Sequence, residues 1–399
     1  MIGEAPVHVA LLSSRRDFYG GEVHFRDLAL GLQERGHRVT CLVRPHSALA
    51  RSLDEDRVGV VRSRLGSALD PVSVAQLAGT LRDLRPDILH THCPPDYYLA
   101  AVASLGSRVC NVATRHQLYP ISFLAAKRPL LDRFAAVIAV SEAVRDGLLA
   151  SGMSARRVVT VLNGIPPCEA AASPASPASP TSPSSPTSLR RELGLQPDGG
   201  PVIGYVGRLC PQKEPDLLLQ AAALLRGRWP GLQIVLVGGD GDGGRYADQL
   251  RVLGRRLRLA VRICGYRRDA ARLIRAFDVM AVTSRAEPFG LVTLEALARG
   301  VPVVATCSGG SREIIRDGRE GLLVPPGDPQ ALAIALSRLL CEHTLRARCE
   351  QAGPRRVASC FEHSRQVRNT EKVYRLALAG APLPTSMAAA PTWCPSRDE

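Results

Sequence analysis

The sequence predicts an α/β protein built from two doubly wound, Rossmann-like parallel-sheet domains in tandem. Short apolar runs alternate with helix-like segments, the alternation restarts in the second half, and a Ser/Pro-rich run separates the two parts. Near-continuous apolar strands separated by helices are typical of a parallel sheet that helices cover on both faces. A chain of 399 residues also exceeds what one hydrophobic core usually serves.

The first domain is expected to span residues 1–168. It begins with the apolar strand Val7–Leu12 and continues into a helix at Glu22–Arg35, which Gly36 ends as a left-handed cap. The later strands and two of the helices between them are predicted at Arg38–Val43, Val58–Arg62, Asp87–His92, Val109–Thr114, Ala136–Val140 and Val158–Leu162, and at Val72–Leu84 and Ser141–Leu149.

A linker is expected at residues 169–189, because repeated Ser-Pro units can form neither a core nor regular hydrogen-bonded structure. The second domain is expected at 190–352. A closing segment at 353–378 follows, with one or two helices at Arg355–Leu378 and Pro354 just ahead of the first, and a Pro- and Ala-rich flexible tail at 379–399. The strands of the second domain are predicted at Val202–Val206, Gln233–Val237, Val261–Cys264, Val279–Thr283, Pro302–Ala305 and Gly321–Val324.

The net charge of +14 is spread along the chain, without a block of basic residues. We therefore do not expect nucleic-acid binding, whereas peripheral contact with anionic lipid fits the charge, at about 1 kcal/mol for each basic residue near the surface. No apolar run reaches the roughly 18–20 residues that span a bilayer. We see no signal peptide, and the eleven scattered cysteines fit a reducing compartment. A cytoplasmic protein is expected, with contact at the inner face of the membrane.

Ligands of open α/β sheets bind beyond the carboxyl ends of the strands, so the chemistry is sought in the loops that follow strands. Glu287 and Glu295 lie eight positions apart after the strand Val279–Thr283, and Gly290 opens the helix between them. Free N–H groups at such a helix start suit an anion. Glu295 stands in an apolar run, where its carboxylate needs hydroxyl or amide partners such as those of a ribose.

A second segment, Gly204–Lys213, runs from a strand through a loop towards the helix Glu214–Leu225. Arg208 and Lys213 flank this loop, and both could reach a diphosphate with charge-assisted hydrogen bonds. Lys213 is one of only three lysines in a chain that otherwise uses arginine, which favours a specific role.

These motifs together resemble the retaining glycosyltransferases of family four, which have the GT-B architecture of two Rossmann-like domains facing a cleft. The resemblance covers roughly residues 7–375. It includes Gly-Arg-x4-Lys, Glu-x7-Glu and the following Gly300-Val-Pro-Val-Val-Ala. Weaker agreement comes from Gly20-Gly21-Glu22, Arg85–His92, Ala139–Ser141, Val161–Ile165 and Gly318–Asp328.

The resemblance implies roles for individual residues. Glu295 would hold the donor's ribose, Glu287 would approach the transferred sugar, and Arg208 and Lys213 would neutralise the diphosphate. Backbone amides near Phe289, Gly290 and Leu291 would hold the sugar or phosphate. Gly21, in the first loop, would let backbone approach the phosphates closely, and His116 would lie beside the sugar near the reacting bond.

The implied reaction moves a sugar from a nucleotide-diphosphate sugar with retention of anomeric configuration and without a metal ion. A UDP-sugar is the first expectation and a GDP-sugar the second. The acceptor implied is a saccharide or lipid-linked saccharide, as in cell-surface polysaccharide biosynthesis, and it would dock on the first domain.

Two other functions stay open: a nucleotide-sugar epimerase of the same shape, and a non-catalytic partner subunit that retains the fold. The four residues Arg208, Lys213, Glu287 and Glu295 argue against the second. Asp240-Gly241-Asp242 imitates a metal-binding Asp-x-Asp but lies in a Gly-rich turn. His90 and His92 share one strand face, yet no further ligand pair follows at a spacing typical of zinc sites.

Overall fold

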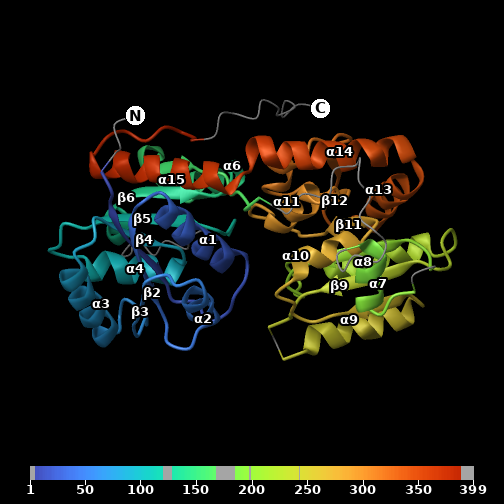
Figure 1. Ribbon diagram of the computed structural model, residues 1–399, viewed down its shortest axis with the longest axis horizontal. Helices are drawn as coiled ribbons and strands as arrows, with labels where there is room; N and C mark the ends of the chain where they lie inside the picture. Colours follow the sequence, from blue (N-terminus) through green and yellow to red (C-terminus); the bar gives the residue numbers. More distant parts are fainter. Residues whose placement is uncertain (1–4, 120–127, 168–184, 197–198, 242, 388–399) are drawn as a thin grey trace. The chain divides into compact units, whose positions relative to one another are not determined.

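The computed structural model describes residues 5–119, 128–167, 185–196, 199–241 and 243–387 (Figure 1). The chain forms two compact units, each described by itself. Unit 1 combines Met1–Pro166 with His363–Glu399, and unit 2 is Pro167–Glu362. Most of the predicted linker 169–189 and the end of the predicted tail 379–399 lie outside the described residues.

The sheet of unit 1 is parallel and has the strand order β3-β2-β1-β4-β5-β6-β7. Its strands β1 and β4 are buried along their whole length, as their apolar sequences predict. The strands are β1 (His8–Ser13), β2 (Arg38–Val43), β3 (Val60–Arg62), β4 (Ile88–Thr91), β5 (Cys110–Arg115), β6 (Phe134–Ala139) and β7 (Val158–Thr160).

Helices of unit 1 start at polar caps where the sequence offers them. The side chains of Ser47, Asp70 and Ser141 accept hydrogen bonds from backbone N–H groups in the first turn of the helix that follows each. The helices are α1 (Gly20–Glu34), α2 (Ala48–Glu55), α3 (Pro71–Leu84), α4 (Pro94–Ala103), α5 (Arg128–Leu131), α6 (Glu142–Ala150), the 3-10 turn η2 (Ala155–Arg157) and α15 (His363–Leu378).

The last helix, α15, belongs to the core of unit 1. It packs against α1, β5 and β6 (Figure 1). Val373 and Tyr374 are fully buried, and the Tyr374 hydroxyl lies 2.6 Å from His90 Nδ1. Glu371 forms ion pairs with Arg35 of α1 and Arg375 of its own helix. The chain therefore leaves unit 1, builds unit 2, and returns to complete unit 1.

Unit 2 also contains a parallel sheet, of order β10-β9-β8-β11-β12-β13. Its strands are β8 (Val202–Val206), β9 (Gln233–Val237), β10 (Ala260–Ile263), β11 (Val279–Val282), β12 (Val303–Thr306) and β13 (Gly321–Val324). Its helices are α7 (Pro186–Glu192), α8 (Pro215–Leu225), α9 (Arg245–Arg256), α10 (Ala270–Leu273), the 3-10 turn η3 (Ile274–Ala276), α11 (Leu291–Ala298), α12 (Ser311–Ile314), α13 (Pro329–Cys341) and α14 (His343–Cys360).

Both units are doubly wound parallel-sheet domains, which confirms the predicted fold class. The strand order reverses direction between β1 and β4 in unit 1, and between β8 and β11 in unit 2. Such a reversal opens a crevice at the carboxyl edge of the sheet, because the helices that follow the two strands cover opposite faces. Each unit therefore has a defined place for a ligand.

The structure differs from the sequence prediction near the end of the chain. The helix α14 begins at His343, well before the expected boundary at 353, and Pro354 lies inside it. The side chains of Leu345, Cys349 and Val357 are buried, and this packing holds the helix although a proline removes one internal hydrogen bond. The helix ends at Cys360, and α15 begins at His363.

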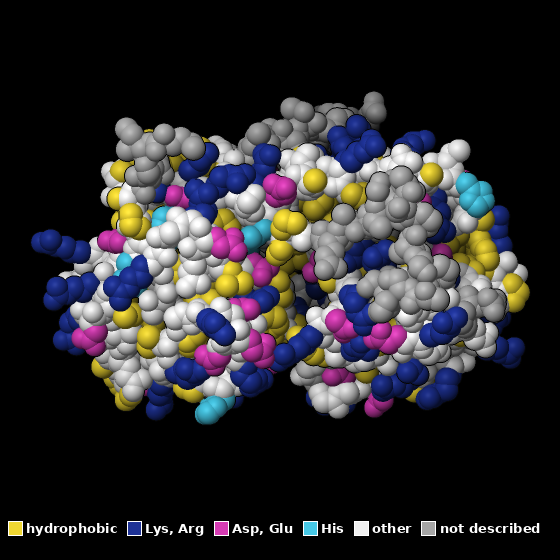
Figure 2. Space-filling model, viewed as in Figure 1, with side chains coloured by type: hydrophobic (Ala, Val, Ile, Leu, Met, Phe, Trp, Pro, Cys, Tyr) yellow, Lys and Arg dark blue, Asp and Glu magenta, His cyan; other side chains and the backbone are white. Residues whose placement is uncertain are grey.

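Surface charge is dispersed. On the face shown in Figure 2, Lys and Arg side chains are interspersed with other residue types over both units. Within the described ranges, no helix is both long and apolar enough to cross a membrane. The nine cysteines in these ranges are all free thiols.

Candidate functional site

The loop after β8 carries Arg208 and Lys213 at the switch point of unit 2. The N–H of Gly207 bonds to the carbonyl of Val237, and the N–H of Leu209 bonds to Gly239, which ties this loop to the one after β9. The hydroxyl of buried Tyr205 donates to the Arg208 carbonyl at 2.8 Å. The backbone is thus fixed, while the Arg208 side chain is exposed to solvent.

Glycine is required where the two loops touch. Gly238 has φ +156°, and a Cβ atom there would lie 1.8 Å from the carbonyl oxygen of Gly207. No side chain fits at that distance, so the close approach of the two backbones depends on this glycine.

Glu287, in the loop after β11, is buried and paired with Lys213. The Lys213 ammonium lies 2.6 Å from Glu287 Oε2, and the Ser284 hydroxyl donates to the same oxygen at 2.7 Å. The Lys213 side chain is 18% exposed and that of Glu287 7% exposed. Among the described residues both hydrogen bonds use Oε2, which leaves Oε1 and two of the three ammonium protons of Lys213 for a ligand.

The start of α11 is anchored next to this pair. The Phe289 side chain is buried against Phe361, with ring centroids 6.0 Å apart, so only its backbone can face a ligand. Gly290 has φ +107° and precedes Leu291, the first helical residue. The N–H groups of a first helical turn lack partners earlier in the helix, so α11 presents amides at the carboxyl edge of the sheet.

Glu295 lies about one turn into α11 and is half-buried. The structure therefore brings Arg208, Lys213, Glu287 and the residues 289–291 to one edge of the unit 2 sheet, with Glu295 on the same helix as Leu291. The segment Asp240-Gly241-Asp242 resembles a metal-binding Asp-x-Asp motif. The Asp240 carboxylate accepts hydrogen bonds from the N–H groups of Gly244 and Ala247 at the start of α9, and residue 242 lies outside the described residues.

The two remaining predicted residues lie in unit 1. Gly21 is in the first turn of α1 rather than in the preceding loop. A Cβ atom there would meet nothing within 4 Å, so the fold of unit 1 does not itself require glycine at this position. His116 directly follows β5 and is half-buried.

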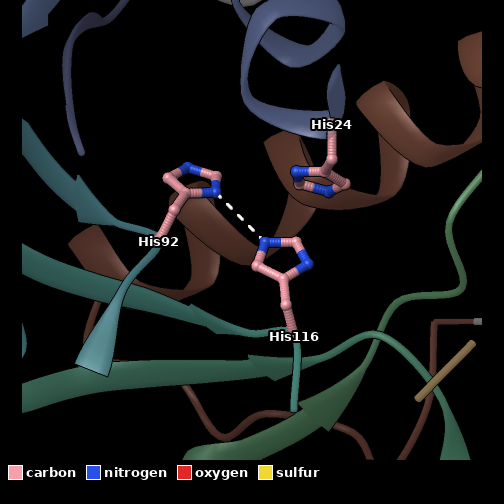
Figure 3. A group of neighbouring side chains, drawn as sticks. All are labelled: His24, His92 and His116. Carbon is pink, nitrogen blue, oxygen red and sulfur yellow. Dashed lines mark hydrogen bonds between the residues drawn. The ribbon is translucent and has the colours of Figure 1, made fainter. Parts of the chain in front are cut away.

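His116 belongs to a cluster with His24 of α1 and His92, which follows β4 (Figure 3). His92 Nδ1 lies 3.4 Å from His116 Nε2. Burial and the neighbouring arginines Arg115 and Arg15 lower the pKa of His116 to about 3. Burial, with the surrounding histidines, holds the pKa values of His24 and His92 well below their usual range. Sequence spacing did not join the three, because the sheet alone brings them together.

A buried carboxyl group was also missed by sequence reasoning. Asp96, in the first turn of α4, accepts a hydrogen bond from the Ser14 N–H at 2.9 Å, while its Oδ1 has no partner in the described part of the chain. Burial raises the pKa of Asp96 to about 6. Its signal is an acidic residue after Pro94-Pro95 at the end of a strand, which is also typical of an ordinary helix start.

A basic pocket of about 440 Å³ lies at the carboxyl ends of β1, β2 and β3. Arg16, Arg44 and Arg64 line it together with His46. Arg44 Nε is buried without a partner among the described residues. Three guanidinium groups around one hollow favour an anionic ligand.

Comparison with known proteins shows the family to which the chain belongs. Residues 18–168 match the family model of glycosyltransferase family 4, and residues 200–342 match that of glycosyl transferases group 1. A D-inositol 3-phosphate glycosyltransferase of a Nocardioides strain is 30% identical over 401 residues, which cover 91% of this chain and 86% of that protein. This chain belongs to the glycosyltransferases of family four.

Solved structures of the family have the same fold. Anabaena HepE, solved in complex with UDP and glucose, is 25% identical with a TM-score of 0.80, and the match covers 92% of this chain and 99% of that one.

Other relatives match only part of the sequence. A D-inositol 3-phosphate glycosyltransferase of Salinispora arenicola is 43% identical over 199 residues, which are 48% of this chain. The first relatives of this kind are matched over less than half of their own length, 44% in the Salinispora protein.

Proposed function

We propose that this chain transfers a sugar from a nucleotide-diphosphate sugar to an acceptor, with retention at the anomeric carbon. The observation that carries the proposal is the Lys213–Glu287 pair beside Arg208 at the switch point of unit 2. The complexes of HepE with UDP and with UDP-glucose support a UDP-sugar as the donor, and a GDP-sugar is the second candidate.

The proposed chemistry is stabilisation of the departing diphosphate. Arg208, Lys213 and the first amides of α11 supply positive charge where the leaving oxygen becomes negative, so transfer needs no metal ion. Lys213 and Ser284 hold Glu287 so that Oε1 can accept a hydroxyl of the transferred sugar. Retention follows when the acceptor attacks the face that the diphosphate leaves, and the leaving phosphate takes the acceptor proton.

Three further residues complete the proposed donor contacts. Glu295, about one turn into α11 beyond the amides of residues 289–291, accepts hydrogen bonds from the ribose hydroxyls. Gly21 admits the phosphates close to the backbone of α1, and His116 hydrogen-bonds the sugar as a neutral imidazole, in keeping with its lowered pKa.

The first candidate for the acceptor is a saccharide or lipid-linked saccharide at the inner face of a membrane. The resemblance to the family and the basic net charge support it. A phosphate-bearing acceptor is the second, and the pocket of Arg16, Arg44 and Arg64 favours it. The relatives named D-inositol 3-phosphate glycosyltransferases point in the same direction.

The two acceptors can be separated with Arg16→Gln, which removes one exposed guanidinium. If the acceptor carries phosphate, this change raises KM for inositol phosphate about tenfold, the worth of one charge-assisted hydrogen bond, and leaves a neutral saccharide acceptor unaffected. Arg82→Gln, an exposed arginine on α3, is the control. Equal KM values for wild type and Arg16→Gln would exclude the pocket as an acceptor site.

The donor site is tested by thermal stability with UDP, GDP, ADP or dTDP, with and without magnesium. A nucleotide at about 100 times its Kd stabilises the fold by about 2.7 kcal/mol. We expect a shift with UDP alone, independent of magnesium, that is lost in Glu295→Ala. The control is Glu350→Ala, which removes a half-buried glutamate on α14 that pairs with Arg346.

The outcomes also separate the alternatives. Absence of any nucleotide shift favours a non-catalytic partner subunit. A shift with a nucleotide-sugar that is converted without an acceptor favours an epimerase. Transfer with an inverted product, seen by NMR of the anomeric proton, would contradict retention.

A further inference from the structure

The carboxyl edge of the unit 1 sheet holds a three-histidine cluster that the proposed transfer reaction does not require as a whole. His24, His92 and His116 each offer one ring nitrogen, and these three atoms lie within 4.8 Å of one another (Figure 3). In the described part of the chain this is the one group of three or more potential metal-ligating side chains at such distances. The residues come from α1 and from the ends of β4 and β5, on either side of the switch point.

The spacing suits a tetrahedral ion. Zinc bonds of about 2.0–2.1 Å to imidazole nitrogens place two ligands of a tetrahedral site about 3.3–3.4 Å apart. His92 Nδ1 and His116 Nε2 are 3.4 Å apart, which is longer than a usual N–H hydrogen bond. A ring nitrogen of His24 lies within 4.8 Å of the ligand atoms of the other two, and the His24 ring centroid is 4.6 Å from that of His116.

The cluster leaves polar atoms unsatisfied. His24 Nδ1 and His92 Nε2 are buried without a hydrogen-bond partner among the described residues, although both side chains are about 5–6% exposed. Unpartnered buried nitrogens are costly, on the order of 1–3 kcal/mol each. A cation in the cluster would replace the long His92 Nδ1–His116 Nε2 hydrogen bond with two metal–nitrogen bonds, whereas His92 Nε2 points away from that contact (Figure 3).

A tetrahedral ion held by three imidazole nitrogens keeps a fourth coordination position for water or another small ligand, and His116 is half-buried rather than enclosed.

We propose that His24, His92 and His116 form a binding site for a divalent transition-metal ion that prefers imidazole ligands, with zinc the best fit. The ion is not needed for transfer. Because it occupies His116, which the proposed function places beside the transferred sugar, zinc acts as an inhibitor that competes with the donor sugar. The inhibitory part rests on the proposed function, whereas the metal site does not.

The test is titration of the full chain with Co²⁺, read by visible absorption, and with Zn²⁺, read by calorimetry. We expect one ion per chain, intense bands of a four-coordinate ion, and no thiolate-to-cobalt charge-transfer band. His24→Gln and, independently, His116→Gln should weaken binding by more than about 100-fold, beyond the loss typical of an outer-shell change. His343→Gln, an exposed histidine of unit 2, is the matched control.

A thermal midpoint of the wild type that rises with Zn²⁺ supports the site without relying on any variant. Absence of one-to-one binding, unchanged binding in both variants, or a thiolate band would overturn the proposal. The proposed metal site and the proposed donor site can fail independently. If the chain binds the ion but its thermal midpoint does not respond to UDP, the metal site is supported and the donor site is contradicted. A UDP response that zinc does not weaken removes the inhibitory role alone.

Discussion

Arg208 and Lys213 have similar predicted roles but different structural surroundings. The Lys213 ammonium neutralises a buried carboxylate, whereas the Arg208 guanidinium is exposed and lies 3.5 Å from Gln212 Oε1. Removing either cation should weaken stabilisation of the leaving diphosphate, but only removal of Lys213 leaves Glu287 without its charge partner. Stability measurements therefore distinguish the two residues.

For Arg208→Gln we expect kcat to fall about 10²–10³-fold, with the free energy of unfolding changed by less than about 0.5 kcal/mol. For Lys213→Gln we expect a similar fall in kcat and a loss of about 2 kcal/mol in stability, because a mostly buried ion pair is broken. Denaturant unfolding and steady-state kinetics measure both. Arg255→Gln, on the exposed part of α9, should change neither, and equal stability of the two variants would contradict the distinction.

Gly21 offers a test of close ligand approach. A Cβ atom at this position meets no protein atom within 4 Å, and alanine is the better helix former by about 0.5–1 kcal/mol. We expect Gly21→Ala to keep or raise the thermal midpoint while it raises KM for the donor. Unchanged donor kinetics would remove Gly21 from the site. Gly147→Ala, a glycine inside α6, is the control.

At this scale the sequence predicted the residue types better than their partners. Lys213 stood out because lysine is rare in this chain, yet the hydrogen bond from Ser284 to Glu287 depends on how one loop turns. The histidine cluster has no local sequence pattern at all, because its members are joined only by the pairing of β1, β4 and β5.

Among the elements, the loops after β8 and β9 are joined by backbone hydrogen bonds and together fix the backbone at Arg208. The variant Gly238→Ala places a Cβ atom 1.8 Å from the Gly207 oxygen, so the two loops must separate. We expect a loss of at least about 2 kcal/mol in stability, together with loss of the UDP-induced thermal shift. The control is Gly227→Ala, where a Cβ atom meets nothing within 4 Å. An unchanged UDP-induced thermal shift in Gly238→Ala would show that the contact between the two loops is not needed for UDP binding.

Strands were predicted closely because buried parallel strands have continuous apolar sequences. The predicted strands Val202–Val206 and Gln233–Val237 match β8 and β9 residue for residue. Helix α14 was placed too late because no side chain caps its start and because proline normally marks a helix boundary. The start of this helix depends on the tertiary packing of Leu345 and Cys349, and a local sequence pattern does not contain that information.

At the scale of the whole molecule, buried titratable groups set the pH dependence of stability. The pKa of Asp96 rises from 3.8 to about 6 on folding, so between these values the folded state holds a proton that the unfolded chain has released. This group therefore lowers the free energy of unfolding, by about 3 kcal/mol in all, as pH rises from about 4 to about 6.

We expect Asp96→Asn to remove that decrease, so that the variant gains stability relative to the wild type across this pH interval. Denaturant unfolding at pH 4, 5, 6 and 7 measures the difference. The buried histidines change stability with pH in the opposite direction, because their lowered pKa values reduce stability as pH falls below 6.5. Both proteins contain these histidines, so their effect cancels in the difference between wild type and variant. Parallel curves for the two proteins would show that folding does not raise the pKa of Asp96.

The return of α15 into unit 1 has a consequence for synthesis on the ribosome. Residues 1–166 leave the exit tunnel first, but Val373 and Tyr374, which help to fill their core, are translated only after the whole of unit 2. Unit 2 is continuous in sequence and can fold while the nascent chain is still attached, so the unit that is made first is the one that folds last. Until α15 has been translated, unit 1 exposes to the cell's chaperones the apolar surface that this helix covers.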